Sequence, residues 1–279
     1  MSIINFIKMH GCGNDFVVID TKSLQDAVLP IDVIKKITDR RYGVGCDQLI
    51  LIEKSEDADC FMRIYNADGT EAGACGNASR CVASLLANTI HKNKITIETA
   101  TNILMANIHA NGLVTIDMGV PKFSVSDLKL LWDINPLSLQ IKIDDMSIDA
   151  AAINVGNIHL ICFYDNDINL ESLVTQVNAL QIFAEEVNIS VINIDHDIVY
   201  GKFSIKIRTW ERGAGETLSC GTAACAATVS AIKRGYILHN TSVEVHSKGG
   251  TLSIEWFRDN GSIMMTGEAI ISFTGQINL

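Results

Sequence analysis

Alternation of apolar and polar residues predicts two similar strands in distant parts of the chain, at residues 62–66 and 205–211. Each strand leads into a glycine-containing loop, and each loop ends in a cysteine followed by glycine, at Cys75-Gly76 and Cys220-Gly221. A run rich in small and apolar residues, without proline, follows each cysteine and predicts a helix. The second helix also has a stop signal, because Lys233-Arg234-Gly235 places basic residues just before a glycine.

The same pattern extends over most of both halves of the chain. A glycine turn precedes a strand at residues 13–20 and again at 156–165, and a helical pattern follows at residues 31–41 and at 170–183. Three short strands are predicted after each cysteine helix, at residues 95–99, 103–108 and 114–118 in the first half and 243–246, 251–256 and 263–266 in the second. A repeat this long exceeds the unit of a solenoid, so we predict two copies of one domain.

The predicted fold is α+β, with two structurally similar domains that each place a mostly antiparallel sheet around one central helix. The N-terminal domain is expected to cover residues 1–118 and the C-terminal domain residues 119–266. A chain of 279 residues is long enough for two hydrophobic cores of this size.

Charge and composition exclude several classes of partner. The net charge is −10 and the sequence pI is about 5.1, and an acidic surface is not attracted to nucleic acid or to an anionic membrane. The first residues carry charge and glycine too early for the apolar core of a signal peptide. The uncharged run at residues 217–232 is shorter than the roughly 18 apolar residues that a membrane span needs. We therefore expect a soluble, cytoplasmic protein.

The chain contains eight cysteines, at positions 12, 46, 60, 75, 81, 162, 220 and 225. Reduced thiols are expected in a chain of this kind. No pair has the C-x-x-C spacing of a zinc ribbon, so we expect no metal. Most of these cysteines are expected to pack as small apolar side chains.

Cys75 and Cys220 differ from the others because each precedes a predicted helix. Unpaired backbone N–H groups and the positive end of the helix dipole favour a thiolate there, or an anion bound beside it. The duplication suggests that the two sulfur atoms belong to two equivalent site halves.

Six motifs, in order and spread over both halves, resemble diaminopimelate epimerase: MHGCGNDFVVID, RRYGVGCDQ, YNADGTEAGACGN, GNIH, EEVNI and ERGAGETLSCGTAACAA. The resemblance implies an active site in the cleft between the domains, with a final strand at residues 267–279 returning to the first domain. It also implies interconversion of LL- and meso-2,6-diaminopimelate in lysine and peptidoglycan precursor biosynthesis. Neither pyridoxal phosphate, nor another cofactor, nor a metal is implied, and the protein is expected to be a homodimer.

The resemblance also assigns roles to individual residues. Cys75 and Cys220 are implied to be the acid/base pair, with His159 as the partner of Cys75 and Glu211 as the partner of Cys220. The amides of Gly76-Asn77 and Gly221-Thr222 are implied to bind the α-carboxylate. The other implied substrate-binding residues are Asn14, Gln48, Asn66, Asn157, Asn188 and Arg212.

Three positions depart from the family pattern, namely Ile158, Ala78 and Ala223. Two alternatives remain open. The first is a related enzyme such as a proline or hydroxyproline racemase or a phenazine-biosynthesis isomerase, although Arg212 favours a substrate with a second charged end. The second is a redox or metal-responsive binding protein that uses the paired cysteines.

Overall fold

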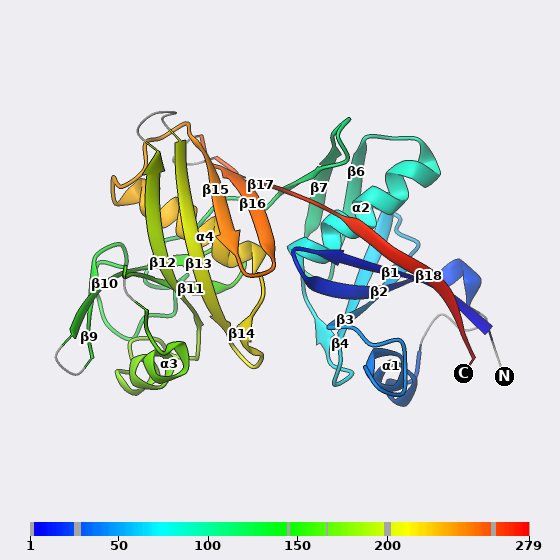
Figure 1. The fold of residues 1–279 in the computed structure, drawn as a ribbon, viewed down its shortest axis with the longest axis horizontal. Helices are drawn as coiled ribbons and strands as arrows, with labels where there is room; N and C mark the ends of the chain where they lie inside the picture. The colour runs from blue at the N-terminus through cyan, green and yellow to red at the C-terminus, as the bar shows by residue number, and fades with distance from the viewer. Residues whose placement is uncertain are drawn as a thin grey trace. The chain divides into compact units, whose positions relative to one another are not determined.

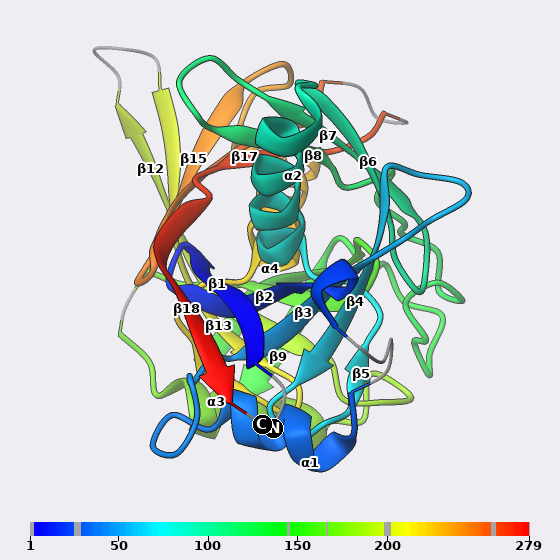
Figure 2. The same ribbon diagram turned by 90° about the vertical axis from the view of Figure 1, so that its right-hand side faces the viewer.

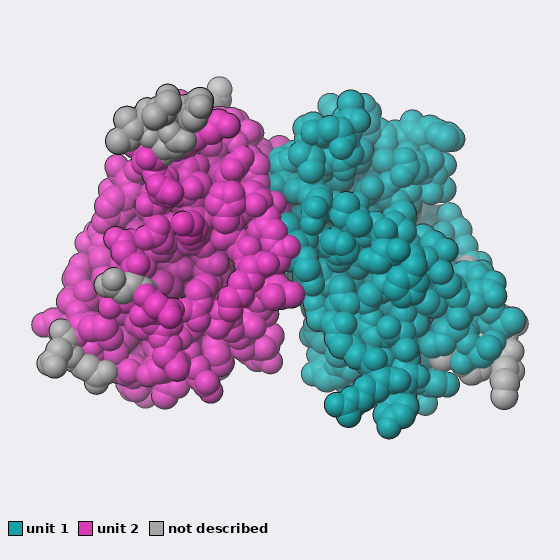
Figure 3. Space-filling model, in the orientation of Figure 1, with its two compact units in different colours: residues 1–117, 266–279 teal, residues 118–265 magenta. Residues whose placement is uncertain are grey.

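The computed structural model describes residues 3–24, 29–143, 146–165, 167–197, 202–257 and 261–278. The chain divides into two compact units, coloured separately in Figure 3. The first unit contains residues 1–117 and 266–279, and the second contains residues 118–265.

The first unit is built from ten strands and two α-helices over its described residues, with a short 3-10 helix at Thr21–Ser23 (Figure 1). The strands are β1 (Ile3–Gly11), β2 (Asn14–Asp20), β3 (Gln48–Glu53), β4 (Cys60–Asn66), β5 (Glu71–Ala72), β6 (Lys94–Glu98), β7 (Ile103–Ile108), β8 (Val114–Asp117), β18 (Ile270–Asn278) and the end of β17 (Met264–Gly267). The helices are α1 (Ile31–Thr38) and α2 (Gly76–Ile90).

The second unit repeats this plan. Its strands are β9 (Leu139–Ile143), β10 (Met146–Asn154), β11 (Ile158–Phe163), β12 (Asn188–Asp197), β13 (Lys202–Glu211), β14 (Gly215–Thr217), β15 (Ser242–Ser247), β16 (Gly250–Glu255) and the start of β17. Its helices are α3 (Leu170–Ala179) and α4 (Gly221–Lys233).

Strand pairing shows the duplication directly. In the first unit β1–β2 is antiparallel, β2–β3 parallel, β3–β4 antiparallel, β4–β6 parallel and β6–β7 antiparallel. The second unit has the same sequence of pairings in β10–β11, β11–β12, β12–β13, β13–β15 and β15–β16. Antiparallel pairs predominate, and the predicted α+β fold with two similar domains is confirmed.

The final strand, β18, pairs antiparallel with β1 and so belongs to the first unit. Figure 2 shows β18 in red beside β1 in dark blue. The first and last described parts of the chain therefore lie in one sheet, with Ile3 opposite Asn278.

One long helix packs into the sheet of each unit. Helix α2 contacts β1, β6, β7 and β8 (Figure 2), and α4 contacts β10, β11, β13 and β16. Nearly all of α4 is buried, which explains its many alanines, because small side chains allow strands to approach a helix closely. Only the first half of α2 is buried, at residues 77–83.

The helices α1 and α3 are shorter than the helical patterns at 31–41 and 170–183. Helix α1 stops at Thr38 because the Asp39 carboxylate accepts hydrogen bonds from the backbone N–H groups of Arg41 and Tyr42, each at 2.7 Å. After α3, Gln181 adopts a left-handed backbone conformation with a φ of 50°. The periodicity of apolar residues does not show where these helices stop, so the predicted helices were too long.

A close backbone approach after α1 provides a test of the fold. A Cβ atom on Gly43 would lie 1.8 Å from the carbonyl oxygen of Lys36. We expect Gly43→Ala to lower stability by more than about 2 kcal/mol, measured as a fall in the midpoint of thermal unfolding. Gly112→Ala is the control, because Gly112 has open space around it and only its φ of +85° costs about 1 kcal/mol. Equal effects of the two changes would contradict the close approach.

Candidate functional site

Cys75 is the N-cap residue of α2, with an extended backbone at φ −151° and ψ 109°. Its carbonyl accepts hydrogen bonds from the backbone N–H and the side-chain hydroxyl of Ser79, both at 2.9 Å. These bonds fix the first turn of α2. The sulfur atom of Cys75 is thereby held at the start of the helix, and the residue is partly buried.

Asn14 contacts both Cys75 and Asn77, which lies in the first turn of α2. The Asn14 Oδ1 atom lies 3.6 Å from the Cys75 sulfur and 3.3 Å from Asn77 Nδ2. An amide oxygen only accepts hydrogen bonds, so Cys75 contacts it as the protonated thiol. We call Asn14, Cys75 and Asn77 the Cys75 group.

The side chain of Asn14 is held in place by a hydrogen-bonded network of two carboxylates and an arginine. Asn14 Nδ2 donates to Asp47 at 2.9 Å, and Arg40 bridges Asp47 at 2.7 Å to both carboxylate oxygens of Asp15 at 2.7 and 3.0 Å. Burial alone would raise the pKa of Asp15, but hydrogen bonds from Arg40 and Lys8 outweigh it and lower that pKa. The turn that carries Asn14 is therefore held by charged hydrogen bonds.

Gln48 and Asn66 form a second polar pair in the first unit. The β3–β4 register places them opposite one another, and Gln48 Nε2 donates to Asn66 Oδ1 at 3.0 Å. Within the described residues, two buried amide oxygens, Gln48 Oε1 and Asn77 Oδ1, have no hydrogen-bond partner. Each is a buried hydrogen-bond acceptor.

In the second unit, Cys220 is the N-cap of α4 and is also partly buried. Its sulfur lies 3.3 Å from the hydroxyl of Thr222. That hydroxyl is 2.9 Å from His159 Nε2, which is also 2.9 Å from Asn157 Oδ1. With Glu211, these residues make up the Cys220 group: Asn157, His159, Glu211, Cys220 and Thr222.

Glu211 stands beside the Cys220 thiol. Burial, and then the Glu211 carboxylate, raise the pKa of Cys220 well above its ordinary range, while the Thr222 hydroxyl acts in the opposite direction. Thr217 donates a hydrogen bond to Glu211 Oε1 at 2.6 Å and so orients the carboxylate. Burial lowers the pKa of His159 to about 3, so its imidazole is neutral near pH 7.

Asn188 and Arg212 form the remaining polar pair. Parallel pairing of β11 with β12 sets Asn188 beside His159, and Asn188 Oδ1 accepts from the backbone N–H of Arg212 at 2.9 Å. The guanidinium of Arg212 is half-exposed, with contacts to Glu185 at 3.3 Å and to the carbonyl of Glu186 at 3.1 Å. Such a guanidinium can turn toward an anionic ligand.

The other six cysteines are buried, and none of them forms a disulfide. Burial raises the pKa of Cys46 to about 11 and the pKa values of Cys60, Cys81 and Cys162 to about 12. Among all eight cysteines, which the structure describes in full, Cys75 and Cys220 alone have solvent exposure above the buried range. The predicted packing role of the others agrees with these positions.

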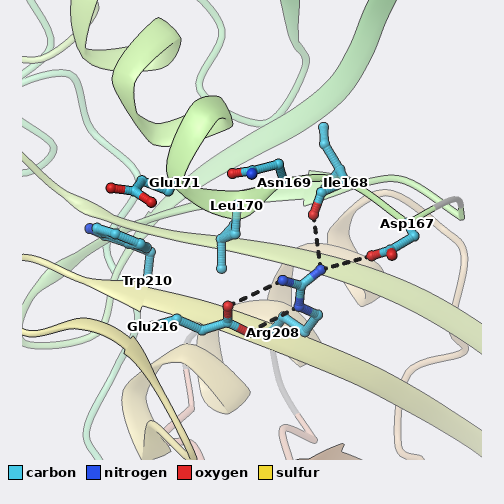
Figure 4. Close-up of a pocket in the computed structure, with 8 residues that line it drawn as sticks. All are labelled: Asp167, Ile168, Asn169, Leu170, Glu171, Arg208, Trp210 and Glu216. Atoms are coloured by element: carbon cyan, nitrogen blue, oxygen red, sulfur yellow. Dashed lines mark hydrogen bonds and ion pairs between the residues drawn. The ribbon is translucent and has the colours of Figure 1, made fainter.

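A separate cavity of about 430 Å³ lies in the second unit (Figure 4). Its lining residues are Asp167, Ile168, Asn169, Leu170, Glu171, Arg208, Trp210 and Glu216. Arg208 is satisfied there by Glu216 at 3.0 and 3.1 Å and by Asp167 at 3.1 Å. Side chains alternate along β13, so Glu211 points to the opposite face from Arg208 and Trp210. This cavity therefore does not contain the Cys220 group.

The described residues include no group of three or more histidine, cysteine, aspartate or glutamate side chains arranged for a metal ion. Within the same ranges, every helix is too short or too polar to cross a bilayer.

A model of the diaminopimelate epimerase family matches residues 6–124 and 151–272. The chain belongs to the diaminopimelate epimerase family. The family consists of isomerases, so the chain is an epimerase-type enzyme.

Relatives in this family match the chain along nearly its whole length. It is 42% identical to the diaminopimelate epimerase of Acidiphilium cryptum, covering 98% of this chain and 96% of that protein. It is 38% identical to the enzyme of Nitrosomonas europaea, covering 99% of both. A Bacillus anthracis phenazine biosynthesis protein of the PhzF family has a TM-score of 0.72 at 18% identity, with full coverage of both chains, and shows the shared fold.

Apart from Gly76 and Gly221, which begin α2 and α4, the predicted site residues lie in the Cys75 group, the Cys220 group and the two polar pairs. That the two cysteines act on one carbon stays a prediction, as does the pairing of His159 with Cys75. Thr217 was not identified from the sequence. The feature that could have identified Thr217 is the short strand β14, which pairs antiparallel with β13 and places Thr217 within hydrogen-bonding distance of Glu211.

The charge of Glu211 gives a direct test of the Cys220 group. We expect Glu211→Gln to lower the pKa of Cys220, because a negative charge beside the thiol is removed. Below that pKa the thiolate fraction rises about tenfold per unit of pKa shift, so Cys220 should react faster with iodoacetamide. Mass spectrometry of the modified peptide measures the rate. The matched control is Glu216→Gln, whose carboxylate pairs with Arg208 and Lys248 instead; an unchanged rate in Glu211→Gln would contradict the arrangement.

Proposed function

We propose that this enzyme interconverts LL- and meso-2,6-diaminopimelate by a two-base mechanism in which Cys75 and Cys220 are the acid and the base. The observation that carries the proposal is the pair of cysteines that are not fully buried, each at the start of an equivalent helix and each beside polar partners. The family relationship supplies the substrate class.

In one direction, Cys220 transfers its proton to Glu211 and the resulting thiolate removes the α-proton of the substrate. The thiol of Cys75 then gives its proton to the opposite face of the same carbon. In the reverse direction the two sulfur atoms exchange roles. A thiol near neutral pH needs an adjacent base for this step, and Glu211 is positioned to accept the proton.

The carbanion is the most unstable species in this reaction, so its charge has to be dispersed. Backbone N–H groups in the first turns of α2 and α4, at Gly76-Asn77 and Gly221-Thr222, have no partner within their own helices. We propose that they bind the α-carboxylate, where the helix dipoles and N–H groups stabilise developing negative charge. Closure around the substrate excludes water and strengthens these interactions.

The distal end of the substrate carries an ammonium and a second carboxylate. Arg212 suits the carboxylate because its guanidinium binds two oxygens at once. The unpartnered oxygens of Gln48 and Asn77 are acceptors for ammonium groups. Asn14, Asn66, Asn157 and Asn188 complete the proposed binding set, with His159 as the proposed partner of Cys75.

This chemistry requires neither pyridoxal phosphate nor a metal, because the thiols move the protons and the backbone amides stabilise the carbanion. The expected place of the reaction is lysine and peptidoglycan precursor biosynthesis. Both sulfur atoms have to stay reduced, which favours the reducing conditions of the cytoplasm.

Isotope exchange tests the proposal. Incubation of the reduced protein with LL-diaminopimelate in deuterated water should give meso product with deuterium at the α-carbon. Cys75→Ala and Cys220→Ala should each lower the rate by at least about 10²- to 10⁴-fold, because each removes one acid/base group. Cys81→Ala and Cys225→Ala are matched controls in the same two helices, where the thiols are buried. Turnover of proline but not of diaminopimelate would overturn the substrate assignment.

We also propose that the protein is a homodimer and that β18 lies in the interface. Ile270, Ile271 and Phe273 on this strand are 41%, 50% and 50% exposed, and a second copy of the chain would cover them. Phe273→Lys should shift sedimentation toward the monomer at low protein concentration, because a charge would enter an apolar contact. Phe257→Lys is the control, since Phe257 is 46% exposed in the other unit. A dimer unaffected by Phe273→Lys would exclude this interface.

A further inference from the structure

The hydroxyl of Thr222 lies close to two other members of the Cys220 group, His159 and Cys220. It is 2.9 Å from His159 Nε2 and 3.3 Å from the Cys220 sulfur. A hydroxyl has one proton, so it can donate to only one of these atoms and must accept from, or merely contact, the other. The choice between them depends on which nitrogen of His159 carries a proton.

The Asn157 contact decides the state of His159. Asn157 presents its Oδ1 atom to His159 Nε2 at 2.9 Å, and an amide oxygen only accepts, so Nε2 must carry the proton. His159 is fully buried, and within the described residues its Nδ1 atom has no hydrogen-bond partner. A proton on Nδ1 would be a buried donor without an acceptor, which is costly. Burial also lowers the pKa of His159 to about 3, so the ring carries a single proton.

A protonated Nε2 atom cannot accept a hydrogen bond from Thr222. Within the described residues, the remaining recorded neighbour of the Thr222 hydroxyl is the sulfur of Cys220. We infer that Thr222 is a positioning residue, whose hydroxyl proton is directed by His159 and Asn157 onto the Cys220 sulfur and stabilises its thiolate form. The inference rests on the proposed function only in its use of Cys220 as an acid/base group.

The step is balanced without any further reactant. The proton of the Cys220 thiol moves to the Glu211 carboxylate, and the negative charge moves from the carboxylate to the sulfur. Thr222 keeps its own proton and donates a hydrogen bond to the sulfur throughout. A hydrogen bond to an ionised acceptor is stronger than one to a neutral acceptor, so the thiolate gains more from it than the thiol does.

The first unit has diverged at this position. Asn77 stands where Thr222 stands, two residues after the cysteine, and its amide donates to Asn14 Oδ1 at 3.3 Å. The same oxygen accepts from the Cys75 thiol. The sulfur of Cys75 therefore donates a hydrogen bond to Asn14, whereas we infer that the sulfur of Cys220 accepts one from Thr222.

Alkylation kinetics test this inference without any substrate. In a Cys75→Ala background, the rate of Cys220 modification by iodoacetamide is followed by mass spectrometry from neutral pH to above the pKa of the thiol. Thr222→Val should raise that pKa by about one unit and slow the reaction about tenfold below it, with no change above it. Thr222→Ser should restore the parent rate, because the hydroxyl is retained. Thr222→Ala makes the same test if the valine variant does not fold.

The matched control is Thr228→Val in the same helix. Thr228 is buried, and within the described residues its hydroxyl has no hydrogen-bond partner, so this change should leave the Cys220 rate within about twofold of the parent. The inference is overturned if Thr222→Val leaves the rate unchanged, or if it slows modification equally at every pH, as a steric effect would. Because diaminopimelate is absent, these outcomes are independent of whether the proposed epimerisation is correct.

Discussion

The structure depends on one constraint that occurs twice, a sulfur atom fixed at the start of a helix that is buried in a sheet. The helix start supplies backbone N–H groups with no partner in the helix, which suit an anion. Burial of the helix body keeps this end from moving, since α4 is enclosed along almost all of its length. A sulfur atom at such a place is held in a defined orientation and stays partly exposed, whereas the other six cysteines are buried.

Duplication made this arrangement but did not keep its halves identical. Cys75 has an amide oxygen and a network of charged groups behind it, from Asn14 to Asp47 and Arg40. Cys220 has a carboxylate, a hydroxyl and a neutral imidazole around it. The backbone plan is common to both, and the side chains give the two sulfur atoms different surroundings.

The sequence was informative where structure is local. Alternation, glycine turns and the cysteine-glycine pairs predicted the strands, the two buried helices and the duplication, because period and turn chemistry are set by neighbouring residues. It was less informative about the ends of α1 and α3, where a side-chain cap and a left-handed residue decide the boundary. It did not reveal Thr217 beside Glu211, nor the contact of Asn14 with Asp47 across 33 positions in the chain. Such contacts depend on strand register and loop path, which are properties of the folded molecule.

Pairing of β1 with β18 has a consequence for biosynthesis. The second unit is encoded between the two parts of the first and is complete before the last strand leaves the ribosome. Domains commonly fold as their sequence emerges, but β1 can pair with β18 only after the second unit has been synthesised. The second unit therefore has its whole sequence available first, and the sheet of the first unit gains β18 afterwards.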